Sequence, residues 1–385
     1  MDERLSRVES VVVEHGKIAA VGATRELESQ FPHARTWNLQ GRSLIPGFVD
    51  AHHHFMVSVL YGNCADCRPE SCRTLQGIQQ RLWAHGQTLK REDWIIGAGY
   101  NQWALTGQRH PNRHDLDAVS TEQPVLLVHF SFHAGVANTK ALQLLGADRL
   151  QEDPPGGKLE RDRSGYPTGR LFEAAFAPME AAARKNLTAR LGPEVLAEIQ
   201  AYEQDLFRLG ITLVNDPAVP RSIQELYELA QEAGKLRMPV VMLPVSDSGF
   251  FIQPWDKVEQ SPPGCGGGNL QVGPLKLFFD GGDHCAMCLS LAQGLRMLWQ
   301  SYNGFKERKW SLRSVLRQTR LRWHWDGKIH TGILYYTRDQ APSIVAKAVA
   351  RGYSVAIHAF GNEAVAQALD AIIPIRDRHG DHPPP

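Results

Sequence analysis

The stretch LIPGFVDAHHH, residues 44–54, carries the strongest signal in the sequence. Its apolar residues around a Pro-Gly turn predict a buried strand that ends in three histidines. Because side chains alternate along a strand, His52 and His54 point to one face and His53 points to the other. Two imidazoles side by side at a strand end can hold a divalent metal ion. A surface cluster of histidines is the alternative, but it would leave the apolar run before it exposed.

Composition and charge exclude several classes of protein. The chain has 385 residues and a net charge of +1, from 42 Lys plus Arg against 41 Asp plus Glu. This balance gives no general attraction for nucleic acid or an anionic membrane, so we expect neither as a partner. No apolar run approaches the ~20 residues that a membrane-spanning helix needs. The polar N-terminus and the small number of cysteines favour a cytoplasmic protein.

Strands and helices are expected to alternate in the second half of the chain. Apolar, β-rich runs predict strands at 211–216, 239–244, 274–280 and 353–358. Helical patterns lie at 193–209, 222–233 and 340–351. This alternation is typical of parallel βα units, and with the strand before His54 it gives five strands of a (β/α)₈ barrel. We expect the last barrel strands to be missing, because a parallel sheet that stops here would expose an open edge.

The predicted domains are unequal. Residues 1–46 form the first part of a small β-sandwich, with strands at 11–13 and 18–22 around a turn at Gly16-Lys17, and residues 47–385 form the barrel. A large insertion, 61–190, follows the first barrel strand and contains strands at 94–100 and 124–129. Residues 281–336 form a lid-like loop whose basic, tryptophan-rich part, 306–325, is expected to cover the catalytic face. A solvated amphipathic helix is the alternative for that part.

Polar residues gather where the predicted strands end, which is where barrel enzymes place their chemistry. They are His52, His54, Asp216, Lys276, Asp280 and His358. Lys276 lies between two leucines, so burial would lower its pKa and leave a neutral amine. Such an amine can take up carbon dioxide as a carbamate, whose two oxygens bridge two metal ions. The alternatives are that Lys276 is paired with a buried carboxylate and that His358 is an ordinary core histidine.

Five motifs spread along the chain resemble those of the amidohydrolase superfamily. They are PGFVDAHHH (46–54), PTGRLFE (167–173), GITLVND (210–216), KLFFDG (276–281) and HAFGNEAV (358–365). The resemblance is to amidohydrolase family 3, in its N-substituted formamide deformylase-like branch. Asn362 departs from the pattern, because an aspartate is common there. The family's sixth-strand histidine and eighth-strand aspartate have no match in this sequence.

The resemblance implies a metal-dependent (β/α)₈ barrel beside a composite β-sandwich. It makes His52 and His54 first-strand ligands and His358 the fifth-strand ligand. Lys276 becomes the bridging carbamate, and Lys276 and His358 become the catalytic pair among the residues present. His133 and Asp280 are expected at the substrate.

The predicted activity is hydrolysis of an amide or formamide C–N bond, other than a peptide bond, in a small molecule. One or two Zn²⁺ ions would activate water for this reaction, although another divalent transition metal also suits these ligands. Because the last ligand and proton carrier of the family are absent, we expect weak or no activity from this chain. An ester or lactone hydrolase using the same site is one alternative. A non-catalytic regulatory or metal-binding protein on a decayed barrel is another, and the sequence also allows a homodimer.

The cysteines have spacings that occur in structural zinc sites. Cys64, Cys67 and Cys72 form one group, and Cys285 and Cys288 form another. Nothing in the pattern brings the two groups together, so free thiols are expected.

Overall fold

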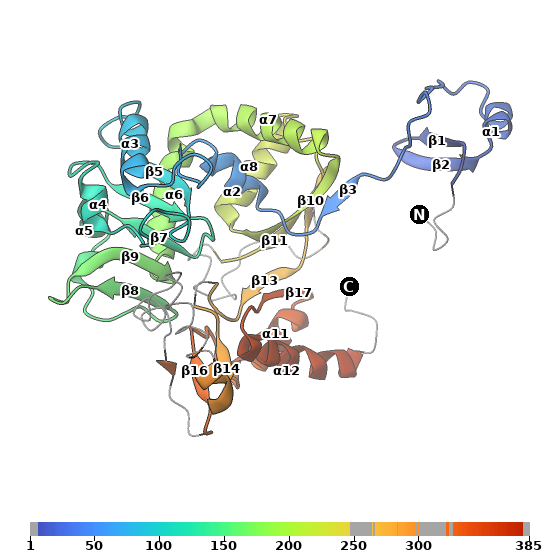
Figure 1. Cartoon of the computed structure of the whole chain (residues 1–385). Helices are drawn as coiled ribbons and strands as arrows, with labels where there is room; N and C mark the ends of the chain where they lie inside the picture. Colours follow the sequence, from blue (N-terminus) through green and yellow to red (C-terminus); the bar gives the residue numbers. More distant parts are fainter. Residues whose placement is uncertain are drawn as a thin grey trace. The chain divides into compact units, whose positions relative to one another are not determined.

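The structure is a computed structural model in which residues 7–246, 264, 266–282, 284–296, 299, 321–322 and 326–379 are described. The chain divides into two compact units, Met1–Phe48 and Val49–Pro385 (Figure 1). Its elements are of mixed α/β type. Among the described residues, no helix combines the length and the apolar character that crossing a lipid bilayer requires.

A β-hairpin forms the centre of the first unit. Strand β1 (Ser10–Glu14) pairs antiparallel with β2 (Lys17–Gly22), and helix α1 (Thr24–Gln30) follows. The loop residues His15 and Gly16 both have positive φ angles, 48° and 74°. Two positive φ angles are typical of the type I′ turn, whose twist suits a hairpin. Both predicted strands are confirmed, with the turn one residue earlier than expected.

The strands that were predicted to alternate with helices lie in the second unit, and they pair in parallel. The four-stranded sheet has the order β12-β11-β10-β3. These strands span Leu270–Val272, Val240–Pro244, Ile211–Val219 and Phe48–Asp50, respectively. Strands β13 (Leu275–Phe278) and β17 (Val355–His358) form a separate parallel pair. Since β10, β11 and β12 are also parallel, their carboxyl ends lie at one edge of the sheet.

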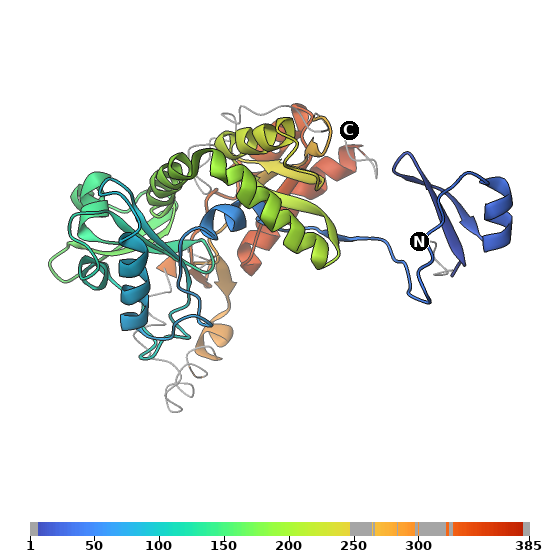
Figure 2. The same ribbon diagram turned by 90° about the horizontal axis from the view of Figure 1, so that it is seen from above.

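Helices separate these strands as the sequence predicts. Helix α7 (Val195–Arg208) precedes β10, and α8 (Arg221–Glu232) connects β10 to β11. Helix α11 (Gln340–Ala350) precedes β17, and α12 (Asn362–His379) follows it. Figure 2 shows α7 and α8, in yellow-green, lying along the strands of the four-stranded sheet. The predicted helices are therefore confirmed to within about two residues at each end.

A six-stranded sheet forms from the chain between β3 and β10. Its order is β4-β5-β6-β7-β9-β8. These strands span Ala65–Asp66, Ile95–Tyr100, Val125–His129, Ala134–Ala137, Pro167–Glu173 and Gly157–Arg161. Helices α2 to α6 span Phe55–Tyr61, Leu75–Gly86, Arg113–Asp117, Thr139–Leu144 and Ala177–Leu191. One large apolar core joins this sheet to the four-stranded one through side chains of α2, α6 and α7.

A small antiparallel sheet lies within the segment predicted as a lid. Its order is β14-β16-β15, with bounds Met287–Leu289, Ile329–Thr331 and Leu321–Arg322. Most of the basic, tryptophan-rich part that is expected to cover the catalytic face, residues 306–320 and 323–325, lies outside the described residues.

Residues 44–49 are not the buried strand that their sequence predicts. The side chains of Leu44, Ile45, Phe48 and Val49 are 65%, 61%, 56% and 62% exposed. Strand β3 is short and stands at the edge of its sheet, with β10 as its single neighbour in the described part of the chain. An apolar run predicts a strand but does not tell an edge strand from a central one, so the expected burial was wrong.

Candidate metal centre

His52 and His54 lie together just beyond the end of β3. Their ring centroids are 5.3 Å apart, with the planes nearly perpendicular. His53 is turned away from them, since its Nδ1 lies 3.1 Å from Asp50 Oδ2 and its Nε2 lies 3.1 Å from Tyr202 Oη. Its backbone N–H also donates to the Asn215 carbonyl. The middle histidine is therefore a structural anchor that fixes the direction of its two neighbours.

Lys276 is buried on β13 with an apolar environment around its amine. The residue is 6% exposed, and its Nζ lies 5.4 Å from the centroid of the Phe278 ring. Within the described part of the chain, its Nζ forms no ion pair with a carboxylate, so the geometry does not support a buried lysine–carboxylate pair. Burial lowers the pKa of Lys276 to about 8. A buried lysine with this pKa holds a substantial neutral fraction near neutral pH.

His358 ends β17, the strand next to Lys276. Its ring centroid lies 5.3 Å from that of His133 and 5.5 Å from that of Phe278. His358 Nε2 is buried and makes no hydrogen bond to the described residues, although Asp280 Oδ1 lies 3.9 Å away. That distance is too long for a hydrogen bond. A buried imidazole nitrogen without a hydrogen-bond partner fits a role as a metal ligand.

Burial and the charge of Lys276 act on the pKa values of all three histidines. Burial is the main cause that lowers the pKa of His52 and that lowers those of His54 and His358 to about 4. The charge of Lys276 lowers all three values further. At neutral pH the imidazoles are therefore uncharged, as metal coordination requires. The ligand atoms of His52, His54 and His358 do not all lie within 4.8 Å of one another, so their binding of one ion stays a prediction.

Asp280 organises the backbone around His358. It is fully buried, and its Oδ1 accepts a hydrogen bond from Phe360 N at 2.9 Å. Its Oδ2 accepts from Gly361 N at 2.7 Å and from Ala286 N at 2.9 Å. Asp280 therefore accepts three backbone hydrogen bonds, and the two from Phe360 and Gly361 hold the turn after β17 in place. Its expected contact with substrate stays a prediction beside this role.

His133 approaches the same place from the six-stranded sheet and has a buried acidic partner. Its Nδ1 lies 2.7 Å from Glu173 Oε2 and 3.0 Å from Gly282 N. Tyr335 donates its hydroxyl proton to the same Glu173 oxygen, at 2.9 Å. Burial by itself would raise the pKa of Glu173, but His133 and Tyr335 outweigh it and the pKa is lowered. A carboxylate is thus kept beside His133.

Two members of this arrangement were not assigned from the sequence. Glu173 ends the motif at 167–173, and its position at a strand end was the available signal. Tyr335 lies in a segment without a motif. Asp216 was noted as a strand-end residue; its Oδ1 lies 4.0 Å from His54 Nδ1, and its Oδ2 accepts from Met56 N and the Tyr227 hydroxyl. Asp216 therefore holds the start of α2 behind His54.

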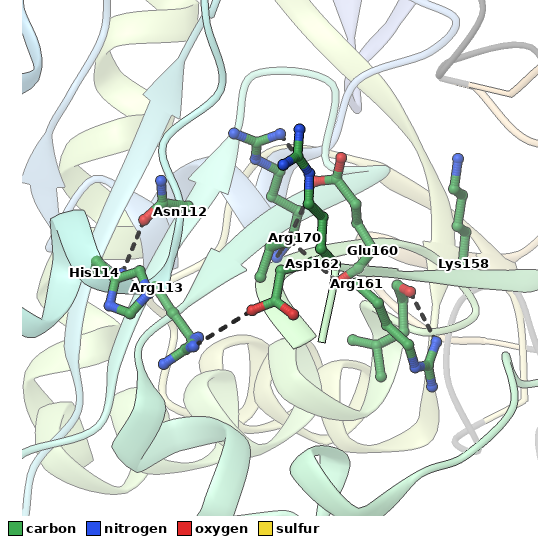
Figure 3. Close-up of a pocket in the computed structure, with 11 residues that line it drawn as sticks. Asn112, Arg113, His114, Lys158, Glu160, Arg161, Asp162 and Arg170 are labelled. Carbon is green, nitrogen blue, oxygen red and sulfur yellow. Dashed lines mark hydrogen bonds and ion pairs between the residues drawn. The ribbon is translucent and has the colours of Figure 1, made fainter. Parts of the chain in front are cut away.

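A separate hollow of about 730 Å³ lies against β8, β9 and α4 (Figure 3). Three of its arginines are paired with carboxylates: Arg170 with Glu160 at 2.9 Å, Arg161 with Asp153 at 3.0 Å and Arg113 with Asp162 at 3.7 Å. None of the residues expected to bind metal or substrate lines it. The hollow is therefore not the site that these residues form.

A sequence profile of the amidohydrolase family matches residues 35–384, most of the chain. The chain belongs to the amidohydrolase family. A profile of the imidazolonepropionase-like composite domain of bacteria matches residues 11–34 of this amidohydrolase, within its first unit. The resemblance drawn from the motifs is thereby confirmed.

Curated relatives agree with this family. The amidohydrolase is 28% identical, over 98% of its length, to the N-substituted formamide deformylase of Arthrobacter pascens. It is 26% identical, over 99% of its length, to the putative amidohydrolase YtcJ of Bacillus subtilis. It spans 64% and 65% of the lengths of these two proteins.

A solved structure shares the fold. It is that of an uncharacterized metal-dependent hydrolase from Pyrococcus horikoshii, with a TM-score of 0.55 and 22% identity. The match covers 95% of this chain and 64% of that chain.

Proposed function

We propose that this protein hydrolyses a non-peptide C–N bond, in an amide or a formamide of a small molecule, with a divalent metal ion. The observation that carries the proposal is the buried Nε2 of His358, which has no hydrogen-bond partner among the described residues and lies on the strand paired with that of Lys276. The paired rings of His52 and His54 support it. Membership of the amidohydrolase family supports the reaction class. Similarity to a formamide deformylase supports the choice of bond.

The proposed fold is the first part of a (β/α)₈ barrel. Strands β3, β10, β11, β13 and β17 would be its first five strands, which matches their order in the chain and their parallel pairing. Residues 1–46 would then belong to a composite sandwich and residues 47–385 to the barrel, with 61–190 inserted. Residues 281–336 would cover the site, since Tyr335 and Gly282 reach Glu173 and His133.

The proposed ligands are His52, His54 and His358, with Lys276 as a carbamate. The neutral amine of Lys276 would attack carbon dioxide and release a proton, and the two carbamate oxygens would supply metal ligands. Imidazole and carboxylate-like oxygen suit Zn²⁺, one ion or two. When bound, such an ion lowers the pKa of water toward ~7 and polarises a carbonyl group.

The remaining residues would position the substrate. His133 stands against His358 and is oriented by Glu173, so it would bind the polar end of the amide. Asp280 would keep the turn at Phe360 and Gly361 close to the substrate through its backbone bonds. Glu173 and Asp280 are fully buried, which strengthens the polar interactions that they make.

The test compares His52→Ala with His114→Ala, a control at an exposed histidine whose side chain is 70% accessible. Metal content is measured by mass spectrometry and turnover on matched amide, formamide, ester and lactone substrates. We expect His52→Ala to lose bound metal and any turnover, while His114→Ala keeps both. Undiminished metal and turnover in His52→Ala would contradict the proposal. Preference for esters would favour the ester hydrolase instead, and metal binding without turnover would favour a non-catalytic role.

A further inference from the structure

A cysteine, a histidine and an aspartate converge in the small antiparallel sheet, on residues that the proposed function does not use. Cys288 on β14 and His330 on β16 are direct cross-strand partners. Cys288 Sγ lies 3.9 Å from His330 Nε2, which in turn lies 2.9 Å from Asp326 Oδ2. The three ligand atoms all lie within 4.8 Å of one another. These are three of the side-chain types that bind zinc in proteins.

The spacing is close to that of a tetrahedral zinc site. With Zn–S near 2.3 Å and Zn–N and Zn–O near 2.0 Å, ligand atoms stand about 3.6 Å apart for S and N and about 3.3 Å apart for N and O. The observed 3.9 Å and 2.9 Å each differ from these values by a few tenths of an ångström. Small side-chain rotations would therefore bring the three atoms around one ion.

The other ring nitrogen of His330 already has the partner that a metal-binding histidine usually has. His330 Nδ1 lies 3.1 Å from Glu363 Oε1, and Glu363 forms an ion pair with Arg322. A carboxylate on the far nitrogen fixes the ring and directs Nε2 to the metal. Glu363 lies in the first turn of α12, so the arrangement joins the small sheet to the helix that follows His358.

Cys288 is held in place from the same helix. Asn362 Oδ1 accepts from Cys288 N at 2.9 Å, and Asn362 Nδ2 donates to Cys288 O at 2.8 Å. The backbone of the cysteine is thereby fixed, which reduces the entropy that metal binding must overcome. Two of the three side chains are thus oriented before any ion arrives.

We propose that Cys288, Asp326 and His330 bind a zinc ion, with water as the fourth ligand, in a site separate from the four-residue metal centre. The thiol would release its proton on binding, because a coordinating thiol is deprotonated. The ion would fasten β14 to β16 and to the turn at Asp326. This proposal does not depend on the proposed hydrolase activity. Without an ion, the cluster would be a histidine shared between two carboxylates beside a free thiol.

Cobalt substitution tests the site, because a cysteine ligand gives Co²⁺ a thiolate charge-transfer absorption in the near ultraviolet. The full chain is stripped with a chelator, loaded with Co²⁺ and compared with Cys288→Ser and Cys285→Ser. Cys285 is the matched control, a cysteine three positions away that is outside the cluster. We expect the absorption in the wild type and in Cys285→Ser and its loss in Cys288→Ser. Circular dichroism checks that each variant is folded.

A second comparison separates this site from the proposed metal centre. His54→Ala should keep the thiolate absorption, whereas Cys288→Ser should lose one equivalent of bound metal and keep the rest. Glu363→Gln should weaken Co²⁺ binding about 10–100-fold, the usual effect of removing such a carboxylate. X-ray absorption at the zinc edge should show one sulfur near 2.3 Å. The absence of sulfur ligation together with equal metal content in wild type and Cys288→Ser would overturn the proposal.

Discussion

Asn362 shows at the scale of one residue why this chain departs from its family's pattern. Its amide donates to Cys288 O and accepts from Cys288 N, so both halves of the side chain are used. A carboxylate, which is common at this position in the family, would have no proton to donate to the Cys288 carbonyl. The asparagine at this position is therefore explained by its two hydrogen bonds to the Cys288 backbone.

The carbamate proposed for Lys276 can be tested directly. After incubation with ¹³C-bicarbonate, we expect a carbamate resonance in the ¹³C spectrum of the wild type and its loss in Lys276→Met. Lys347→Met, at an exposed lysine on α11, is the control and should keep the resonance. A resonance that persists in Lys276→Met would exclude this lysine as the carboxylated one.

Gly361, which follows Phe360, has no room for a side chain. A Cβ there would lie 1.8 Å from the Ala286 carbonyl oxygen. Ala286 cannot easily move, because Asp280 binds its N–H. Gly361→Ala should therefore lower the free energy of unfolding by about 2 kcal/mol or more, in chemical denaturation.

The control for this substitution is Gly267→Ala, since nothing lies within 4 Å of a Cβ at Gly267. That variant should change stability by less than about 1 kcal/mol. Equal effects of the two substitutions would show that the close approach to Ala286 is not what requires glycine.

At the scale of elements, helix α4 depends on a reciprocal cap. Asn112 Oδ1 accepts from the N–H groups of His114 and Asp115, and Asp115 Oδ2 accepts from Asn112 N. Arg109 adds a two-pronged ion pair to the same carboxylate. This short helix has five residues, too few to be stable without such caps.

Asp115→Ala should lower the free energy of unfolding by about 1–2 kcal/mol at pH 7. Burial by itself would raise the pKa of Asp115, but Arg109 and Asn112 outweigh it, so the folded-state pKa is depressed. The stabilisation is therefore present above the unfolded pKa of about 3.9 and is lost as pH falls through the folded value. The gap between wild type and variant should close in acid, as denaturation at several pH values would show.

Glu122→Ala is the control, because Glu122 belongs to an exposed ion pair with Arg91. Such pairs contribute about 0–1 kcal/mol. A pH-independent gap for Asp115→Ala would mean that its carboxylate charge is not what stabilises α4.

Local pattern predicted most of the elements and failed where position in the sheet matters. Runs such as 240–244 and 275–278 are β-branched or apolar, so their strands were predictable. The histidines of residues 52–54 follow β3 instead of ending it, since the strand ends at Asp50, and beyond it His53 N still donates to Asn215 O on β10. Strand pairing is set by distant residues, which a local pattern does not contain.

At the scale of the molecule, the first unit ends in a segment without regular structure. Residues 31–47 contain no helix or strand, and Arg35 and Arg42 are exposed there. Backbone that is exposed and lacks ladder hydrogen bonds is readily cleaved by proteases. Among the basic residues between 7 and 60, trypsin should therefore cut first at Arg35 or Arg42.

Mass spectrometry of a short digest would identify fragments beginning at Thr36 or Ser43. The double variant Arg35→Gln, Arg42→Gln should resist this early cleavage and be cut more slowly, at Lys17 in β2 and at Arg25 in α1. Cleavage first at Lys17 or Arg25 would show that these elements are less ordered than the segment that follows α1.

Some contacts in the site could not be predicted from the sequence, because they join residues that are far apart along the chain. The sequence predicts His52, His54, Lys276 and His358 as a group, because parallel strands bring their carboxyl ends to one edge, and this grouping stays a prediction. The pairing of His133 with Glu173 was not predictable, since it depends on the register between β7 and β9. The cluster of Cys288, Asp326 and His330 likewise depends on cross-strand register, which spacing in the sequence does not reveal.

Backbone hydrogen bonds near Asp280 hold together the beginning and the end of the segment that follows β13. Tyr335 N donates to Phe279 O, Gly281 N donates to Ile333 O, and Ile333 N donates to His284 O. The two ends of this segment are thus hydrogen-bonded to each other and, through Asp280, to the turn after His358. A segment of a different length, inserted between these hydrogen bonds, should therefore leave the position of His358 unchanged.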